Sequence, residues 1–337
     1  MRKLIRVSLL TVLVVIAGAG GWVIYQHDYD LREEKVTITG GEHPLRGVLA
    51  MPKHGHGPYG LVVFVHGDGP VDATDDGFYR PIWETMARAG YASLSWNKPG
   101  VGGAPGNWLH QSMQHRAEET VAAIEWAKRR SDIDRNRMGL WGGSQAGWVM
   151  PKAARLSSDV RFLIAVSPAI NWLRQGRYHL LAELRARNAS PSQVKSKLAQ
   201  SDRMLRALSN GQTYEQYRAA GGDVSGISND RWTFITRNYA SDASADLAAL
   251  RVPVLLILAG HDINVDVADT EAGYRQRLRT PGQLRILRYP AAAHSLMRKD
   301  IEDSSFKTYM TAIATPRSLF VAGFLRDQRR YLEETDR

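Results

Sequence analysis

Residues 139–148 of this 337-residue chain read GLWGGSQAGW and place Ser144 among glycine and other small residues. Apolar residues precede and follow Ser144, which is typical of a strand, a sharp turn and a helix. Such a turn lifts a serine hydroxyl clear of the backbone, where it can attack a carbonyl carbon. The match to G-x-S-x-G is imperfect, because Ala146 replaces the second glycine. The turn alone is weak evidence, so its value depends on partners elsewhere in the chain.

A nucleophilic serine needs a base within hydrogen-bond reach and a carboxylate that orients the base. When the serine lies on a turn of this kind, the acid and then the base follow it in the chain, each after a strand. Asp262 comes directly after one run of apolar residues, and His294 follows the next such run. We therefore predict that Ser144 is the nucleophile, Asp262 the acid and His294 the base, with Asp266 as a nearby rival for the acid.

The oxyanion that forms during such an attack needs preformed N–H donors aimed at it. We predict that one donor is the backbone N–H of Gln145, directly after Ser144. The other is the N–H of Asp68, in the glycine-rich loop after the apolar run 60–65. The carboxylate of Asp68 would repel the oxyanion, so we expect this side chain to point away from it. We expect His66 to brace the loop rather than to transfer protons.

The sequence around these residues alternates between predicted strands and helices. Strands are predicted at 35–39, 46–51, 60–65, 91–96, 138–141, 162–166, 252–258 and 283–289, and helices at 79–89, 115–129, 145–155, 267–278 and 316–332. The first two strands alternate polar and apolar residues, which indicates an antiparallel pair at a sheet edge. Later strands are continuous apolar runs, as in a buried parallel sheet. The pattern predicts an α/β fold with a mostly parallel sheet flanked by helices.

The alternation stops between residues 169 and 247, where the sequence is helical and polar. We predict a helical cap inserted into a single α/β domain that comprises residues 34–168 and 248–333. Aromatic residues of the cap would either line the substrate pocket or form the core of the cap itself. They are Trp172, Tyr178, Trp232, Phe234 and Tyr239.

The first 25 residues have the pattern of a targeting segment. Arg2, Lys3 and Arg6 precede an uncharged run from residue 7 to residue 25, which is long enough to cross a bilayer. Positive charge before such a run predicts a cytoplasmic N-terminus and an exported remainder. The run is either an anchor in the inner membrane, with the remainder facing the periplasm, or a signal peptide cut after Ala19. A buried core helix would leave the basic flank unexplained.

Composition excludes several other chemistries. The chain has no cysteine, so disulfides, thiolate metal sites and cysteine nucleophiles are ruled out. Its net charge is +10, but the basic residues are spread along the chain, and we expect no nucleic-acid partner. His54 and His56 fit a solvated turn, and Asp72, Asp75 and Asp76 fit a charged rim loop. We therefore predict neither a metal nor a cofactor.

Together these motifs resemble the α/β-hydrolases of the dienelactone-hydrolase and prolyl-oligopeptidase-like branch over residues 35–332. The motifs are His66-Gly67-Asp68-Gly69-Pro70, Asn97-Lys98-Pro99-Gly100-Val101-Gly102, Gly142-Gly143-Ser144-Gln145-Ala146-Gly147-Trp148, Gly260-His261-Asp262-Ile263-Asn264-Val265 and Ala293-His294. The resemblance implies an eight-stranded sheet, a helical cap between the sixth and seventh strands, and a triad of Ser144, Asp262 and His294.

The chain departs from the family pattern at two places. Ala146 puts a methyl group where the helix and the strand of the turn pack closest. Asn97 and Pro99 stand where the family more often has an acidic and a basic residue, which concerns a structural turn. Neither departure removes a catalytic group.

The site predicts hydrolysis of carboxylic esters or thioesters through an acyl-enzyme on Ser144, with a small-molecule acyl substrate. A peptidase or amidase would use the same residues on another bond, and an acyltransferase would exclude water. A non-catalytic protein that binds a partner through the cap fits an intact triad poorly. The sequence does not determine the natural substrate or the oligomeric state, because specificity depends on the shape of the cap and the loops.

Overall fold

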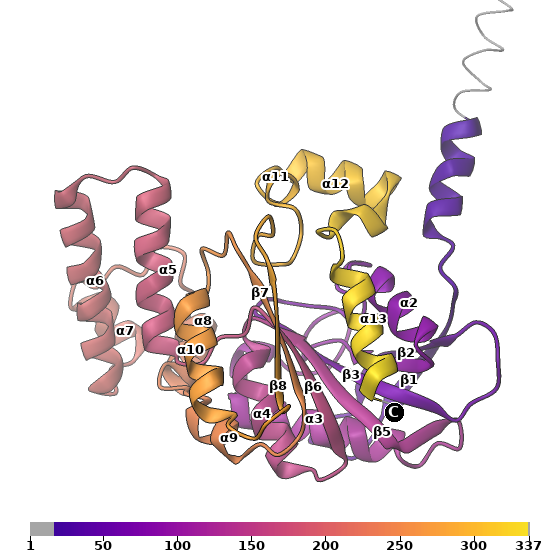
Figure 1. Cartoon of the computed structure of the whole chain (residues 1–337). Coiled ribbons are helices and arrows are strands. Elements are labelled where there is room, and N and C mark those ends of the chain that lie inside the picture. The colour runs from indigo at the N-terminus through magenta and orange to yellow at the C-terminus, as the bar shows by residue number, and fades with distance from the viewer. Residues whose placement is uncertain (1–16, 336–337) are drawn as a thin grey trace, which may run out of the picture.

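The computed structural model of the chain describes residues 17–335. Its centre is an eight-stranded sheet with the order β1-β2-β4-β3-β5-β6-β7-β8 (Figure 1). The strands are β1 (Leu31–Ile38), β2 (Leu45–Pro52), β3 (Tyr59–Val65), β4 (Tyr91–Trp96), β5 (Ile133–Gly143), β6 (Val160–Val166), β7 (Val254–Ala259) and β8 (Leu284–Tyr289). β2 runs antiparallel to β1 and β4, and the other neighbours pair in parallel. The predicted α/β fold with a mostly parallel, eight-stranded sheet is confirmed.

Two hydrophobic cores cover the two faces of this sheet. The helices that pack on it are α2 (Arg80–Arg88), α3 (Met113–Ala127), α4 (Ala146–Leu156), α10 (Val267–Arg277) and α13 (Phe324–Thr335). Alternate residues of a strand point to opposite faces. Leu61 and Val63 of β3 therefore join the core under α3 and α4, whereas Val62 and Phe64 join the core under α2 and α13. Burial on both faces explains why β3 reads as a continuous apolar run.

The stretch between β6 and β7 forms the cap, which consists of five helices. They are α5 (Trp172–Ala186), α6 (Pro191–Ser209), α7 (Tyr214–Ala219), α8 (Asn229–Asn238) and α9 (Ser244–Ala249). Ser190 and Thr213 begin α6 and α7 with capping boxes, in which side chain and backbone satisfy each other's hydrogen bonds. α5 and α6 stand beside the sheet at its β8 side (Figure 1).

The C-terminal part differs from the sequence prediction. A helix was expected over residues 316–332, but α13 begins only at Phe324. Gly323, with a φ of 90°, breaks the chain direction immediately before it. Two helices that the sequence analysis did not predict, α11 (Lys299–Glu302) and α12 (Ser305–Ala314), come between β8 and α13. β5 is also longer than predicted, since it begins at Ile133.

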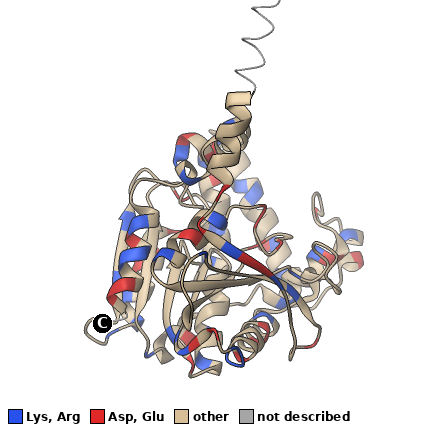
Figure 2. Cartoon of the chain, turned by 90° about the vertical axis from the view of Figure 1, so that its right-hand side faces the viewer, with Lys and Arg blue, Asp and Glu red and all other residues tan. Residues whose placement is uncertain are grey.

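Residues 17–27 form a helix that leaves the domain beside α12 (Figure 1). Basic and acidic residues are interspersed over the domain, whereas this helix carries no Lys, Arg, Asp or Glu (Figure 2). None of the helices within residues 17–335 is long and apolar enough to cross a bilayer. The predicted anchor or signal peptide at residues 1–25 lies for the most part outside the described residues.

Candidate active site

Ser144 lies at the sharp turn between β5 and α4. Its φ is 54°, in the left-handed region that a residue other than glycine rarely adopts. The Ser144 N–H donates to the carbonyl of Val166 (3.0 Å), and the Ser144 carbonyl accepts from the N–H groups of Gly147 (3.0 Å) and Ala169 (3.1 Å). These three hydrogen bonds hold a strained turn in one conformation, which is how such strain persists at functional sites.

Two glycines make room for this turn. A Cβ at Gly142 would lie 2.6 Å from the Cβ of Ala146, and a Cβ at Gly147 would lie 2.3 Å from the carbonyl oxygen of Ala169. Both distances are shorter than a van der Waals contact, so neither position accepts a side chain without a shift. The methyl group of Ala146 fits because Gly142 opposite it has none.

Asp262 and His294 meet at the carboxyl end of β7 and β8. Nδ1 of His294 lies 2.7 Å from Oδ2 of Asp262. Oδ1 of Asp262 accepts the backbone N–H groups of Asn264 and Val265, both at 2.8 Å, and Asp262 is only 4 % exposed. Because the carboxylate can only accept, Nδ1 carries the proton, and Nε2 is the ring nitrogen left free to act as a base.

Asp266, the rival acid, has a different environment. It is the N-cap of α10, and its Oδ1 accepts the N–H groups of Ala268 (3.0 Å) and Asp269 (3.1 Å). An acidic N-cap satisfies the free donors of a helix and needs no catalytic explanation. The structure therefore places Asp262, and not Asp266, beside His294.

The glycine-rich loop that contains Asp68 lies against the turn of Ser144. A Cβ at Gly67 would lie 3.7 Å from the Cβ of Ser144. Nζ of Lys98 donates to the carbonyl of Gly67 (2.6 Å). In a trans peptide the C=O and the following N–H point in opposite directions, so the N–H of Asp68 points away from Lys98. Gln145 lies at the N-terminal end of α4, where backbone N–H groups have no intrahelical partner.

The carboxylate of Asp68 points to the cap. Its two oxygens accept the two terminal nitrogens of Arg231 on α8, at 3.0 Å and 2.7 Å. Nε2 of Gln145 also donates to it (3.1 Å). Burial raises the pKa of Asp68, but the hydrogen bonds and charge of Arg231, together with Lys98, hold it below its usual value. The negative charge is thus turned towards a guanidinium group.

Two buried cations, Lys98 and Arg116, support this loop, and the sequence analysis assigned a role to neither. Arg116 donates to the carbonyl of His66 (2.5 Å) and to the side chain of Gln145. Burial lowers the pKa of Lys98 well below its usual value, and also lowers that of Arg116. Lys98 is the second residue after the buried strand β4, and Arg116 lies on the buried face of α3. These positions were the available signals in the sequence. Both side chains hold carbonyl groups of the loop that carries the predicted N–H donor of Asp68, and so fix the position of that donor.

His66, at the start of the same loop, fixes it through hydrogen bonds of its buried ring to Tyr79 and Trp96. Burial and the nearby Lys98 lower its pKa to about 3, so the ring is neutral at physiological pH. Its Nε2 lies 2.5 Å from the carbonyl of Trp96, which can only accept, so Nε2 carries the proton. Nδ1 must then accept the hydroxyl of Tyr79 at 3.0 Å. A neutral ring with both nitrogens engaged has a structural role, as its sequence position suggested.

Ser144 and His294 line one cavity of about 610 Å³. The cavity has an apolar side between the sheet and the helices α2 and α13, and a more polar side under the cap, where Trp172 accompanies polar residues. The apolar side is lined by Phe78, Ile82, Trp141, Val166 and Phe324, and the polar side by Gln175, His179, Arg231 and Asn264. Asp75 is a further acidic residue of the lining, and burial with the neighbouring Asp76 and Asp72 raises its pKa to about 6.

Both roles that the sequence left open for the aromatic residues of the cap occur. Trp172 lines the cavity and stacks on Trp148, with ring centroids 5.0 Å apart. Trp232 belongs to a small core inside the cap, and Tyr239 packs against that core. Phe234 is fully buried in the main core instead.

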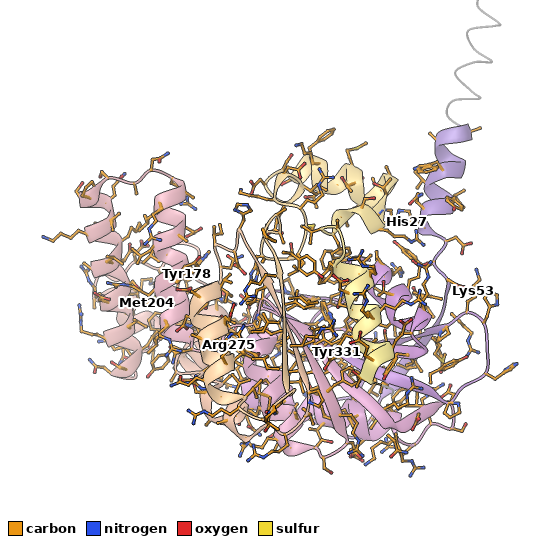
Figure 3. The ribbon with its side chains drawn as sticks, in the orientation of Figure 1. His27, Lys53, Tyr178, Met204, Arg275 and Tyr331 are labelled. Carbon is orange, nitrogen blue, oxygen red and sulfur yellow. The ribbon has the colours of Figure 1, made fainter. Side chains whose placement is uncertain are left out.

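Helix α5 contacts the loop that carries the acid. The hydroxyl of Tyr178 donates to the carbonyl of Asp262 (2.8 Å; Figure 3). His179 and Gln175 donate to the next two carbonyls, at Ile263 (3.0 Å) and Asn264 (2.8 Å). With Arg231 on Asp68, the cap therefore contacts both the acid loop and the glycine-rich loop.

We expect Arg231→Ala to lower kcat by about 10- to 100-fold, because the Asp68 carboxylate loses its partner beside the developing oxyanion. Substrate should retain most of its affinity, so the loss should be seen in kcat more than in KM. Steady-state kinetics measures both. The double variant Arg231→Ala/Asp68→Asn removes the unpaired charge and should recover part of the loss. An unchanged kcat in Arg231→Ala would contradict this role.

The fold and this arrangement of residues define a serine hydrolase of the α/β-hydrolase fold. The sequence of residues 56–301 matches the hydrolase family described as serine aminopeptidase, S33. The chain belongs to this family, and the resemblance stated from the motifs is confirmed.

Solved structures support the fold. An esterase from Pyrobaculum calidifontis is similar with a TM-score of 0.57 and 16% identity, over 93% of this chain and 89% of that one. A dienelactone hydrolase from Anabaena variabilis has a TM-score of 0.50 and 16% identity, over 91% and 97%. An uncharacterized 31.7 kDa protein of Escherichia coli is 28% identical over 80 residues, which are 24% of this chain and 28% of that protein.

Proposed function

We propose that the protein hydrolyses carboxylic esters or thioesters through an acyl-enzyme on Ser144. The observation that carries this proposal is the 2.7 Å pair of Asp262 and His294 in the cavity whose wall includes Ser144 at its strained turn. A base oriented by a buried carboxylate is what a serine hydroxyl needs to become a nucleophile.

Each step of the proposed reaction uses one of these groups. Oγ of Ser144 attacks the carbonyl carbon while Nε2 of His294 takes the hydroxyl proton, and the N–H groups of Gln145 and Asp68 stabilise the oxyanion. His294 then gives the proton to the leaving alcohol or thiol as its bond to the acyl carbon breaks. Water then attacks the carbonyl carbon of the acyl-enzyme while His294 takes a proton from it. The bond to Oγ of Ser144 breaks, His294 returns the proton to this oxygen, and the carboxylic acid product leaves. Asp262 stays ionised throughout.

The two sides of the cavity support a substrate with an apolar acyl group and a polar leaving group. Phe78, Ile82 and Phe324 offer an apolar surface to an acyl chain, whereas Gln175 and Asn264 offer hydrogen bonds to a polar leaving group. A screen of esters across acyl chain lengths would measure the depth of the apolar side. A preference for charged acyl groups would contradict this orientation.

Cleavage of an amino-terminal peptide bond is the second candidate. The family description names an aminopeptidase, and such an enzyme must bind a free ammonium group. Asp75 places a carboxylate on the cavity wall, where it would pair with that cation above pH of about 6.

Matched substrates distinguish the two candidates. Four compounds with one aminoacyl group would be compared, as ester or amide and with the amine free or acetylated. For an esterase we expect cleavage of both esters, with little effect of acetylation or of Asp75→Asn. Amide cleavage that requires the free amine and is lost in Asp75→Asn would establish the peptidase instead.

We further propose that residues 1–25 are retained and anchor the protein in the inner membrane, with the catalytic domain in the periplasm. The three basic residues before the uncharged run support this orientation. N-terminal sequencing of protein recovered from the cell envelope tests it. A chain that begins at Gly20 would show the cleaved alternative and overturn the anchor.

A further inference from the structure

Helix α12 turns an apolar stripe outward. Phe306, Tyr309 and Met310 are 74 %, 66 % and 45 % exposed, and none of the ten residues of this helix is buried. With Ile313 they occupy positions i, i+3, i+4 and i+7, which form one face of a helix. Soluble domains rarely expose a contiguous apolar face without a partner, so this stripe marks an interaction surface.

A second group of exposed apolar residues lies beside the first. Trp22, Ile24 and Tyr25, in the helix of residues 17–27, are 50 %, 74 % and 69 % exposed. Six of the nine large apolar residues that are exposed within residues 17–335 thus belong to these two helices.

Hydrogen bonds fix the two helices to each other. Nε1 of Trp22 donates to the carbonyl of Ala314 (2.8 Å), and Nε2 of His27 donates to the carbonyl of Ile313 (3.0 Å). Figure 3 shows His27 at the base of the N-terminal helix, close to the end of α12. Arg317, three residues after the end of α12, donates to the carbonyl of Gln26 (2.6 Å) and so also holds the N-terminal helix. Whatever surrounds Trp22 and Tyr25 therefore also lies close to α12.

We propose that α12 and the end of the N-terminal helix, with Trp22 and Tyr25, form a lipid-contacting face at the membrane–water interface, where the anchoring segment leaves the bilayer. The proposal rests on the anchoring of residues 1–25 proposed above. The uncharged run begins at residue 7, outside the described residues, and continues into the helix that contacts α12. Trp and Tyr, which are prominent on this face, are enriched at membrane–water interfaces.

Apolar contact rather than net positive charge would hold this face on the membrane. The basic residues next to α12 are already paired, because Arg298 contacts Asp300 and Lys299 contacts Asp303. Lys307 on α12 itself lies 3.8 Å from Asp300. Attraction to anionic lipid therefore contributes little, and insertion of the aromatic side chains dominates.

This face is linked in the chain to the catalytic cavity. α11 and α12 lie between Ser295 and Phe324, and both of these residues line the cavity. An acyl ester dissolved in the bilayer is the substrate class that this link favours, because the same chain segment runs from the lipid-contacting face to the apolar lining at Phe324.

Site-specific fluorescence tests the proposal on the full chain. The protein has no cysteine, so single cysteines can be labelled without background. We would place a fluorophore at Phe306→Cys and Met310→Cys, and at Ser131→Cys as the matched control. Ser131 is exposed just before the amino end of β5, an interior strand, whereas α12 follows the carboxyl end of β8. Each labelled protein would be reconstituted into vesicles of phosphatidylcholine. The vesicles would be prepared with and without a nitroxide on the acyl chains of the lipid.

We expect the nitroxide to quench at least about half of the emission at positions 306 and 310 and less than about a tenth at 131. Addition of phosphatidylglycerol should leave this difference unchanged. Labels at 306 and 310 that are unquenched would overturn the proposal. A blue-shifted emission without quenching would mean that protein, and not lipid, surrounds the labelled face. That protein would be residues 1–16 or a second copy of the chain. Quenching only with anionic lipid would overturn the apolar contact.

The same vesicles separate this proposal from the proposed function. A fluorophosphonate probe reports on Ser144 independently of the fluorophore. Probe labelling without quenching would remove the lipid-contacting face and leave the hydrolase intact. Quenching without probe labelling would support the lipid-contacting face and contradict the proposed hydrolase activity.

Discussion

Replacement of Ser144 by alanine is expected to lower kcat by about six orders of magnitude, to the residual rate that binding and oxyanion stabilisation provide. The hydroxyl is the only group that can form the acyl-enzyme, so no neighbouring residue replaces it. The backbone hydrogen bonds of the turn do not involve the hydroxyl, and alanine can make all of them. Melting temperature should therefore change little while labelling by a fluorophosphonate probe disappears.

Ser167 provides the matched control for this variant. It is a buried serine directly after β6, and its φ of 42° is also left-handed, yet it does not line the cavity. Ser167→Ala should keep most of the activity and all of the probe labelling. If folded Ser144→Ala protein were still labelled by the probe, the assignment of the nucleophile would be wrong.

Replacement of Asp262 by asparagine is expected to lower kcat by about four orders of magnitude, with little change in KM. Oδ1 faces two backbone N–H donors, so the amide oxygen of asparagine must take that position. The amide NH₂ then faces Nδ1 of His294 and donates to it. His294 is left with its proton on Nε2, the wrong tautomer for a base towards Ser144.

Asp266→Asn is the control for the acid. Asparagine caps a helix about as well as aspartate, so α10 should be unaffected. Steady-state kinetics of the two variants, with the melting temperature of each, would separate the two acids. A large loss in Asp266→Asn and none in Asp262→Asn would exchange their assignments.

The sequence was most informative where the physics is local. Continuous apolar runs such as residues 60–65 predicted buried parallel strands, and the small residues around Ser144 predicted the turn. Both features depend on periodicity and on side-chain size, which a sequence displays directly. The predicted ends of helices and strands were less accurate, since α13 begins at Phe324 and not at residue 316.

The support of the glycine-rich loop could not be predicted in this way. Arg231 and Asp68 are 163 residues apart in the chain, and Lys98 lies 31 residues from the carbonyl of Gly67. The place of Lys98 after a buried strand indicates burial, but among the 44 Lys and Arg residues nothing local identifies the partner of either cation. α12 does carry an apolar repeat at helical spacing, and only the structure shows that this stripe faces outward instead of packing on the sheet.

The cap holds both halves of the predicted catalytic machinery in place at once. α5 holds the carbonyls of the Asp262 loop, and Arg231 on α8 holds the carboxylate of Asp68. Gln175 and Arg231, which make these contacts, also line the substrate cavity. Specificity and rate therefore depend on the same side chains, and a cap substitution that changes which substrates fit is expected to change the rate with every substrate as well.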